Sequence, residues 1–150
     1  MTEFTAASIQ GLDARQFATL VKQTPDRTLV TTMSGPDRGP ILDAIFNKMP
    51  DLFRPERAGQ TNAVIHWSIT DGPDGGSSTY QVAIADGKCT VTASPDQDPR
   101  LAVTIGPVDF LKIIAGRGNP TMMFMTGKLK AKGDLGLATS IANLFELPRV

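Results

Sequence analysis

The sequence of 150 residues predicts a single α+β domain in which helices precede a mainly antiparallel sheet. Two observations lead to this prediction. Apolar residues recur at helical spacing up to Phe53, whereas apolar and polar residues alternate from Asn62 onward. The pair Asp86-Gly87 separates two alternating runs and is a strong hairpin signal, because both turn positions need positive φ. We therefore expect helices packed on one face of a five-stranded sheet.

The first two helices are predicted from their starting residues. Asp13 is expected to cap the first helix, and Thr24-Pro25 to cap and open the second. The inward residues are predicted to be Phe17, Leu20 and Val21 in the first helix and Leu29, Val30 and Met33 in the second.

A third helix is predicted from Pro40, and Pro50 is expected to stop or kink it. Its apolar residues recur three and four positions apart: Ile41, Leu42, Ile45, Phe46 and Met49. Residues 55–59 are expected to form a linker turn that leads into the sheet.

Five strands are predicted from the alternation of apolar and polar residues. The first three form an antiparallel meander over residues 62–70, 77–85 and 88–94, and the others lie near 101–105 and 128–133. Each strand has one apolar face, which predicts a sheet that helices cover on one side.

The remaining helices are predicted after the fourth strand. Gly106-Pro107 opens one, and Asn119-Pro120 opens a short methionine-rich one that Gly127 ends. Asp134 is expected to cap the last helix. Their apolar residues are Phe110, Leu111, Ile113 and Ile114 in the first, and Leu137, Ala138, Ile141, Leu144 and Phe145 in the last.

Composition narrows the class of protein. The chain has 15 basic and 15 acidic residues, and this balance argues against a nucleic-acid partner. A single cysteine fits a reducing compartment. No secretory signal and no apolar run of membrane-spanning length is visible, so we expect a soluble cytoplasmic protein.

Residues that carry chemistry are sparse. His66 and Cys89 are the only members of their types, so the usual histidine and cysteine sets for zinc cannot form. His66 is expected to have a surface or hydrogen-bonding role, and Cys89 to be inert. Residues 116–118 follow a helix rather than a strand, which excludes a dinucleotide fingerprint. The residues therefore predict no enzyme, no cofactor and no metal.

Two clusters allow two interpretations each. Lys128, Lys130 and Lys132 line one face of a strand, and we favour a solvated, protected edge over transient contact with an anionic membrane surface. The methionines at 122, 123 and 125 fit a core helix, although methionine also suits changeable apolar partners.

A wider resemblance rests on ordered motifs between Ile41 and Phe145. These are residues 53–59 leading into 62–65, residues 80–82 and 86–89, residues 109–116, and the closing segments 119–138 and 143–145. In order and spacing the chain resembles the sterol carrier protein two family of lipid-binding domains. Residues 1–38 are expected to be a helical extension outside this likeness, and the peroxisomal tail of that family is missing.

The resemblance implies a mixed five-stranded sheet, helices over one face and an apolar tunnel between them. The tunnel would hold a fatty acid, fatty acyl-CoA, sterol or phospholipid without any catalytic step. Its walls would be Ile65, Trp67, Phe110, Ile113, Ile114, Met122, Met123, Met125, Leu137, Ile141, Leu144 and Phe145. The alternative is an interaction module that buries the same apolar face in a homodimer or a partner complex.

Overall fold

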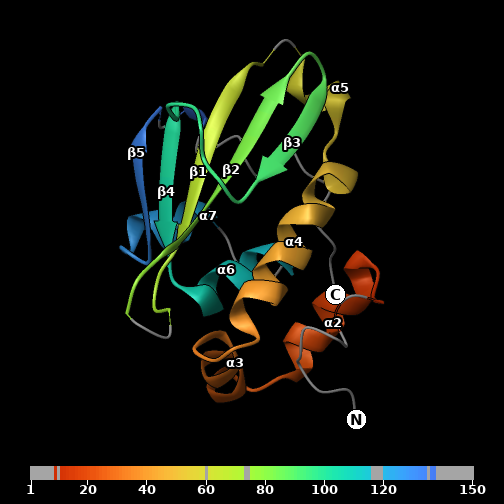
Figure 1. Cartoon of the computed structure of the whole chain (residues 1–150), viewed down its shortest axis with the longest axis vertical. Helices are drawn as coiled ribbons and strands as arrows, with labels where there is room; N and C mark the ends of the chain where they lie inside the picture. Colours follow the sequence, from red (N-terminus) through yellow and green to blue (C-terminus); the bar gives the residue numbers. More distant parts are fainter. Residues whose placement is uncertain are drawn as a thin grey trace.

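The computed structural model describes residues 9, 11–59, 61–72, 75–115, 120–134 and 136–137. Its centre is a five-stranded sheet in the order β3-β2-β1-β4-β5, with helices packed against it (Figure 1). The strands are β1 (Ala63–Ile69), β2 (Ser78–Ala85), β3 (Lys88–Thr92), β4 (Leu101–Ile105) and β5 (Leu129–Gly133).

The sheet is mixed, as expected. The strands β1, β2 and β3 form the predicted antiparallel meander, β4 returns parallel to β1, and β5 pairs antiparallel with β4. The turn between β2 and β3 has φ values of 54° at Asp86 and 72° at Gly87, so the hairpin predicted from this dipeptide is confirmed. The bounds of all five strands lie within two residues of the prediction.

Two N-terminal helices precede the region that resembles a known family. Helix α2 (Ala14–Gln23) begins with a capping box in which the Asp13 carboxylate accepts from the Gln16 backbone N–H at 2.7 Å. Helix α3 (Asp26–Met33) follows without the predicted cap at Thr24, whose hydroxyl instead donates to the Leu20 carbonyl. Val30, predicted to face inward, is 50% exposed.

Helix α4 (Arg38–Leu52) begins two residues before Pro40, and Pro50 lies inside it. Pro50 therefore does not stop this helix, which ends at Leu52. The other effect expected of Pro50, a kink, stays a prediction. Within three residues the chain enters a short helix, α5 (Pro55–Ala58), where a linker turn was predicted. Pro55 is the first residue of α5, a position at which its missing N–H leaves no helical bond unmade.

The chain between β4 and β5 carries helices α6 (Pro107–Ile114) and α7 (Pro120–Met125). Two backbone bonds end α7: Gly127 N–H donates to the Phe124 carbonyl at 3.2 Å, and Lys128 N–H donates to the Met123 carbonyl at 2.9 Å. This is a Schellman motif, and Gly127 adopts the φ of 82° that it requires. The sequence predicted this end of the helix correctly.

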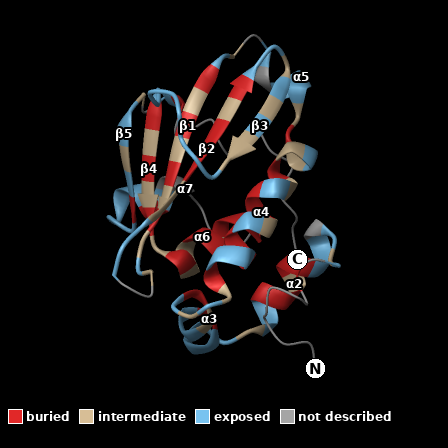
Figure 2. Cartoon of the chain, in the orientation of Figure 1, coloured by how far each residue is buried: buried red, intermediate tan, exposed pale blue. Residues whose placement is uncertain are grey.

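A line of aromatic rings joins the sheet to two helices. Phe46 of α4 stacks on Tyr80 of β2 with ring centroids 4.2 Å apart and on Phe110 of α6 at 5.2 Å. Phe110 also meets Trp67 of β1 at 5.7 Å. Buried residues concentrate along β1, β2 and β4 and along α4 and α6 (Figure 2). The inner face of the sheet is therefore covered by closely packed side chains.

Polar contacts fix the same interface at its borders. The Tyr80 hydroxyl donates to the Asp43 carboxylate at 2.6 Å, and burial together with this bond raises the pKa of Tyr80. Arg38 is 3% exposed and donates to the carbonyls of Met33, Ile69 and Thr70. Its guanidinium thus ties the junction of α3 and α4 to the end of β1.

We predict that Phe46→Ala lowers the free energy of unfolding by about 3–5 kcal/mol, because it removes the ring that Tyr80 and Phe110 contact and leaves a cavity. Denaturant unfolding followed by circular dichroism measures this change. Phe124→Ala deletes the same ring at a position that is 43% exposed, and is expected to change stability by at most about 1 kcal/mol. Equal effects of the two substitutions would contradict the packing described here.

Candidate functional site

The strongest candidate site is the apolar interior between β1 and α6. Five of the residues predicted to line a tunnel are buried there, at exposures of 0% to 7%. They are Ile65 and Trp67 on β1 and Phe110, Ile113 and Ile114 on α6. Ile65, Trp67 and Ile69 share the inner face of β1 because side chains of a strand alternate between its faces. The structure thus brings this part of the predicted set together.

The register continues this apolar face across the sheet. Trp67 pairs with Tyr80 on one side and with Val103 on the other, and Ile65 pairs with Val82 and Leu101. Side chains opposite each other in neighbouring strands touch, so these pairs form continuous apolar rows. The rows make a floor on which an apolar ligand could lie without meeting a charge.

The exposures of the methionines on α7 correct part of the predicted tunnel wall. Met123 is 9% exposed and packs into the core, but Met122 and Met125 are 57% and 75% exposed. The interpretation of all three as core is therefore wrong, because α7 turns only one of them inward. Met122 and Met125 therefore do not line the apolar interior formed by the described residues.

The last predicted helix is only partly described. Leu137 is buried at 6% exposure, and its backbone N–H donates to the Asp134 carboxylate at 3.1 Å, which is the predicted cap. This bond and Arg100, whose guanidinium lies 2.8 Å from the same carboxylate, lower the pKa of Asp134. Ile141, Leu144 and Phe145 lie outside the described residues.

An apolar cavity of about 30 Å³ lies between the N-terminal segment, α4 and α6. Its lining residues are Ile9, Phe17, Ala44, Ile45, Lys48, Met49, Leu52 and Ile114. A cavity of this size holds about one water, whereas small-molecule sites span roughly 300–1,000 Å³. This cavity by itself is therefore too small to hold a lipid.

Sequence reasoning did not find this cavity. Ile9 stands outside any periodic pattern, and Ala44 and Lys48 lie outside the apolar spacing predicted for α4. The Lys48 ammonium donates to the Leu12 carbonyl and so joins α4 to the chain before α2. The available signals were the apolar faces predicted for Phe17, Ile45, Met49 and Ile114, and they did not show that these four residues border one cavity.

The outer face of the sheet carries polar groups. His66 Nε2 lies 3.3 Å from Gln81 Oε1, and the Gln81 amide donates to the Asp96 carboxylate at 2.9 Å. These bonds hold the loop after β3 on the sheet and give His66 the hydrogen-bonding role that was expected. Within the described part of the chain no group of His, Cys, Asp and Glu side chains is arranged to hold a metal ion.

Cys89 lies on β3, half-buried, and pairs with Ile84. Burial raises the pKa of its thiol to about 11. The thiolate, which is the nucleophilic form, is therefore scarce at neutral pH.

None of the described helices combines the length and the apolar character that crossing a bilayer requires.

Comparisons with known proteins identify a family for most of this chain. The model of the SCP-2 sterol transfer family matches residues 42–146. Sterol carrier protein 2 of Homo sapiens is 35% identical over 81 residues, which make up 54% of this chain and 15% of that protein. This chain therefore corresponds to a small part of that relative's length.

Solved structures agree with the fold. Apo sterol carrier protein 2 of Yarrowia lipolytica superposes with a TM-score of 0.56 at 22% identity, covering 75% of this chain and 94% of that one. The palmitated SCP2L2 protein of Aedes aegypti gives a TM-score of 0.54 at 19% identity, covering 73% and 94%. The mixed sheet, the order of its elements and the match over residues 42–146 together show that the chain belongs to the SCP-2 sterol transfer family.

Proposed function

We propose that the protein binds a lipid between the inner face of β1 and helix α6 and carries it without chemical change. The ligand class is a fatty acid, fatty acyl-CoA, sterol or phospholipid. The observation that carries this proposal is the continuous apolar interior, built from Trp67, Phe110 and their neighbours, on the fold of a lipid-binding family.

The chemistry of the interior fits an apolar chain. Burying each CH₂ group of a ligand contributes about 0.8 kcal/mol before the costs of association. Large aliphatic and aromatic side chains that offer no directional polar group would select by size and shape, which supports a broad range of lipids. The palmitated state of the related mosquito protein supports a fatty acid as one ligand of this chain.

A lipid chain needs more space than this small cavity offers, so we infer that α6 moves when a lipid binds. Ile114 is the residue through which this can happen, because it belongs to α6 and also lines the small cavity beside α2 and α4. Movement of α6 toward that cavity would loosen the contact of Phe110 with Trp67, whose ring centroids are 5.7 Å apart. Met49 borders the same space, and its flexible side chain can repack at low cost.

The close contacts among Phe46, Tyr80, Phe110 and Trp67 favour a second candidate function, an interaction module. An interaction module would bury the same apolar face in a homodimer or against a partner protein and would take up no lipid. The two functions differ in one observable, which is uptake of a free lipid by the folded protein. The cytoplasmic location stays a prediction from the sequence.

We predict that a fluorescent long-chain fatty acid binds saturably and that unlabelled palmitate displaces it. Ile114→Phe is expected to weaken uptake several-fold, because the ring fills the space into which α6 would move, while stability changes by at most about 1–3 kcal/mol. Fluorescence titration measures uptake, and circular dichroism confirms folding.

The matched control is Val30→Phe, which adds the same ring on α3 at a position that is 50% exposed, and it should leave uptake unchanged. Normal uptake by the Ile114→Phe protein would contradict the proposed place of the ligand. Absence of uptake by the folded parent protein would favour the interaction module.

A separate prediction concerns the reactivity of the Cys89 thiol. With a pKa of about 11, its alkylation by iodoacetamide at pH 8 should be roughly tenfold or more slower than for a free cysteine. Because deprotonation rises with pH, the rate should climb steeply from pH 8 to 10 and level off only near pH 11. In denaturant the rate should level off near the ordinary pKa of about 8.5. A plateau near pH 8 in the folded protein would show a reactive thiol instead.

A further inference from the structure

Helix α7 is apolar on the side that faces solvent as well as on the side that faces the core. Among the described residues, the large apolar side chains that are exposed are Val30 and three residues of α7: Met122, Phe124 and Met125. Their exposures on α7 are 57%, 43% and 75%, against 9% for Met123. This concentration on a six-residue helix is unlike the rest of the described surface.

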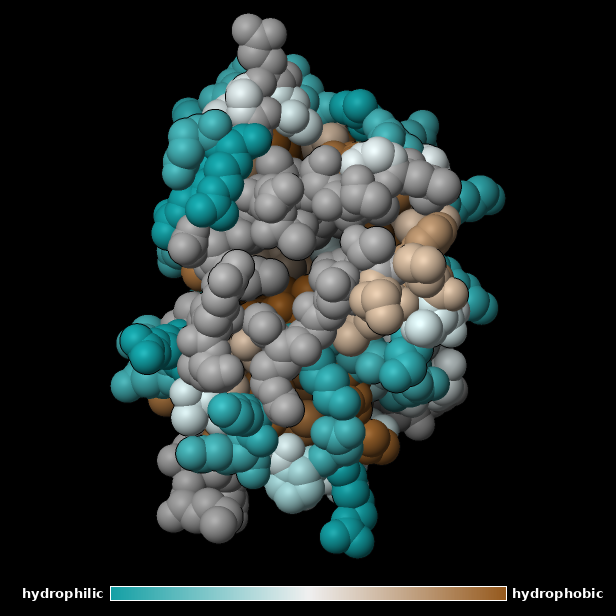
Figure 3. Space-filling model, turned by 180° about the vertical axis from the view of Figure 1, so that it is seen from behind, coloured by the Kyte–Doolittle hydropathy of each residue, from teal (hydrophilic) through white to brown (hydrophobic). Residues whose placement is uncertain are grey.

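Helical geometry explains the pattern. Residues advance by about 100° per position, so Met123 marks one side and the other three cover the opposite arc. A helix that is apolar all round normally lies inside a core or in a membrane. Here Met123 is buried in the core, whereas Met122, Phe124 and Met125 stay largely exposed. Figure 3, seen from behind, shows a pale brown patch at the right-hand edge, on the side where α7 lies.

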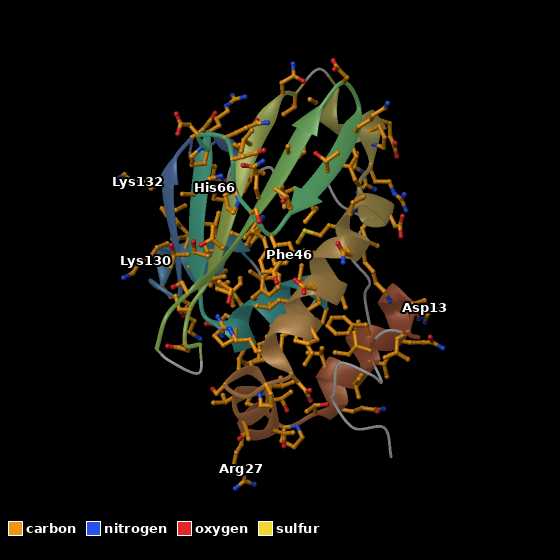
Figure 4. The ribbon with its side chains drawn as sticks, in the orientation of Figure 1. Asp13, Arg27, Phe46, His66, Lys130 and Lys132 are labelled. Carbon is orange, nitrogen blue, oxygen red and sulfur yellow. The ribbon has the colours of Figure 1, made fainter. Side chains whose placement is uncertain are left out.

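Basic residues adjoin this helix. Lys128, Lys130 and Lys132 are exposed, and β5, which carries the last two, packs beside α7. Residues 120–133 contain no acidic residue, although the whole chain has zero net charge. Figure 4 shows Lys130 and Lys132 pointing outward from the free edge of the sheet. The next acid, Asp134, is paired with Arg100 at 2.8 Å.

We propose that α7 and the three lysines form a docking surface for an anionic lipid bilayer. The surface combines apolar side chains that can enter the interfacial region with lysines that attract acidic headgroups, as interfacial helices do. A second copy of the chain is a less suitable partner for this surface than an anionic bilayer. A two-fold interface would place the same patches against each other and would bring six lysines together.

The inference rests on the proposed function, because docking would place a lipid carrier where its cargo is exchanged. It favours the other interpretation of the lysine face, contact with an anionic membrane surface, over a solvated and protected edge. The preference for such an edge rested on the lysines alone, and the exposed side of α7 supplies the missing apolar partner.

Sedimentation with vesicles tests the proposal. The parent protein should bind vesicles of phosphatidylcholine with phosphatidylglycerol, should bind pure phosphatidylcholine weakly, and should dissociate as salt is raised. Lys128→Gln/Lys130→Gln/Lys132→Gln should weaken binding roughly tenfold or more, and Phe124→Gln/Met125→Gln should weaken it at any salt concentration.

Two controls match these variants. Arg15→Gln/Lys22→Gln/Arg27→Gln removes the same charge from exposed positions of α2 and α3, and Val30→Gln removes an exposed apolar side chain elsewhere. Both should bind vesicles like the parent protein. Equal losses in the controls and in the α7–β5 variants would overturn the proposal, since binding would then follow net charge alone.

Uptake of the fluorescent fatty acid in the absence of vesicles separates this proposal from the proposed function. The docking variants should take up the lipid normally. Normal uptake without vesicle binding by the parent protein would refute the docking surface and leave the carrier function intact. Concentration-dependent dimerisation of the parent protein that Phe124→Gln/Met125→Gln abolishes would assign the surface to a second copy instead.

Discussion

Phe46 lies between the rings of Tyr80 and Phe110, and this contact joins α4, the sheet and α6. The sheet of β1, β2 and β4 can bury its inner face only if helices cover it, and the stack sets how closely they do so. Phe110 extends the contact to Trp67. The Tyr80–Asp43 bond at 2.6 Å holds the polar end of the same interface.

This packing would limit the affinity with which the protein binds a lipid. The described residues proposed to hold the ligand, Trp67 and Phe110 among them, also contact one another, so binding would exchange part of these contacts for contacts with a lipid. The net affinity is therefore much smaller than the buried apolar area suggests. The cavity beside Ile114 supplies space for the exchange, and part of its lining, Ile9 and Phe17, comes from the N-terminal segment outside the family match. If the proposed function holds, substitutions in this segment would alter lipid binding through its contacts with α4 and α6.

The architecture could be predicted from sequence because local signals and packing agree. Alternation and the Asp86-Gly87 turn determine the strands and their register, and Gly127 determines the end of α7. Several local signals failed: Pro50 does not stop α4, Thr24 does not cap α3, residues 55–58 form a helix, and Val30, Met122 and Met125 are exposed. Spacing identifies an apolar helix but not how much of it the core can cover. The size of the cavity was unpredictable for a similar reason, since it depends on how side chains from three separate elements meet.

Trp67 gives the most direct test, because it is the single tryptophan of the chain and lies on the proposed floor of the site with 3% exposure. A fatty acid that carries bromine along its chain quenches tryptophan emission only at close range. The account predicts that the brominated acid quenches Trp67 saturably, with the same concentration dependence as uptake, and that the unbrominated acid does not. Confirmed uptake without quenching would contradict the account, because the lipid would then lie away from β1 and α6.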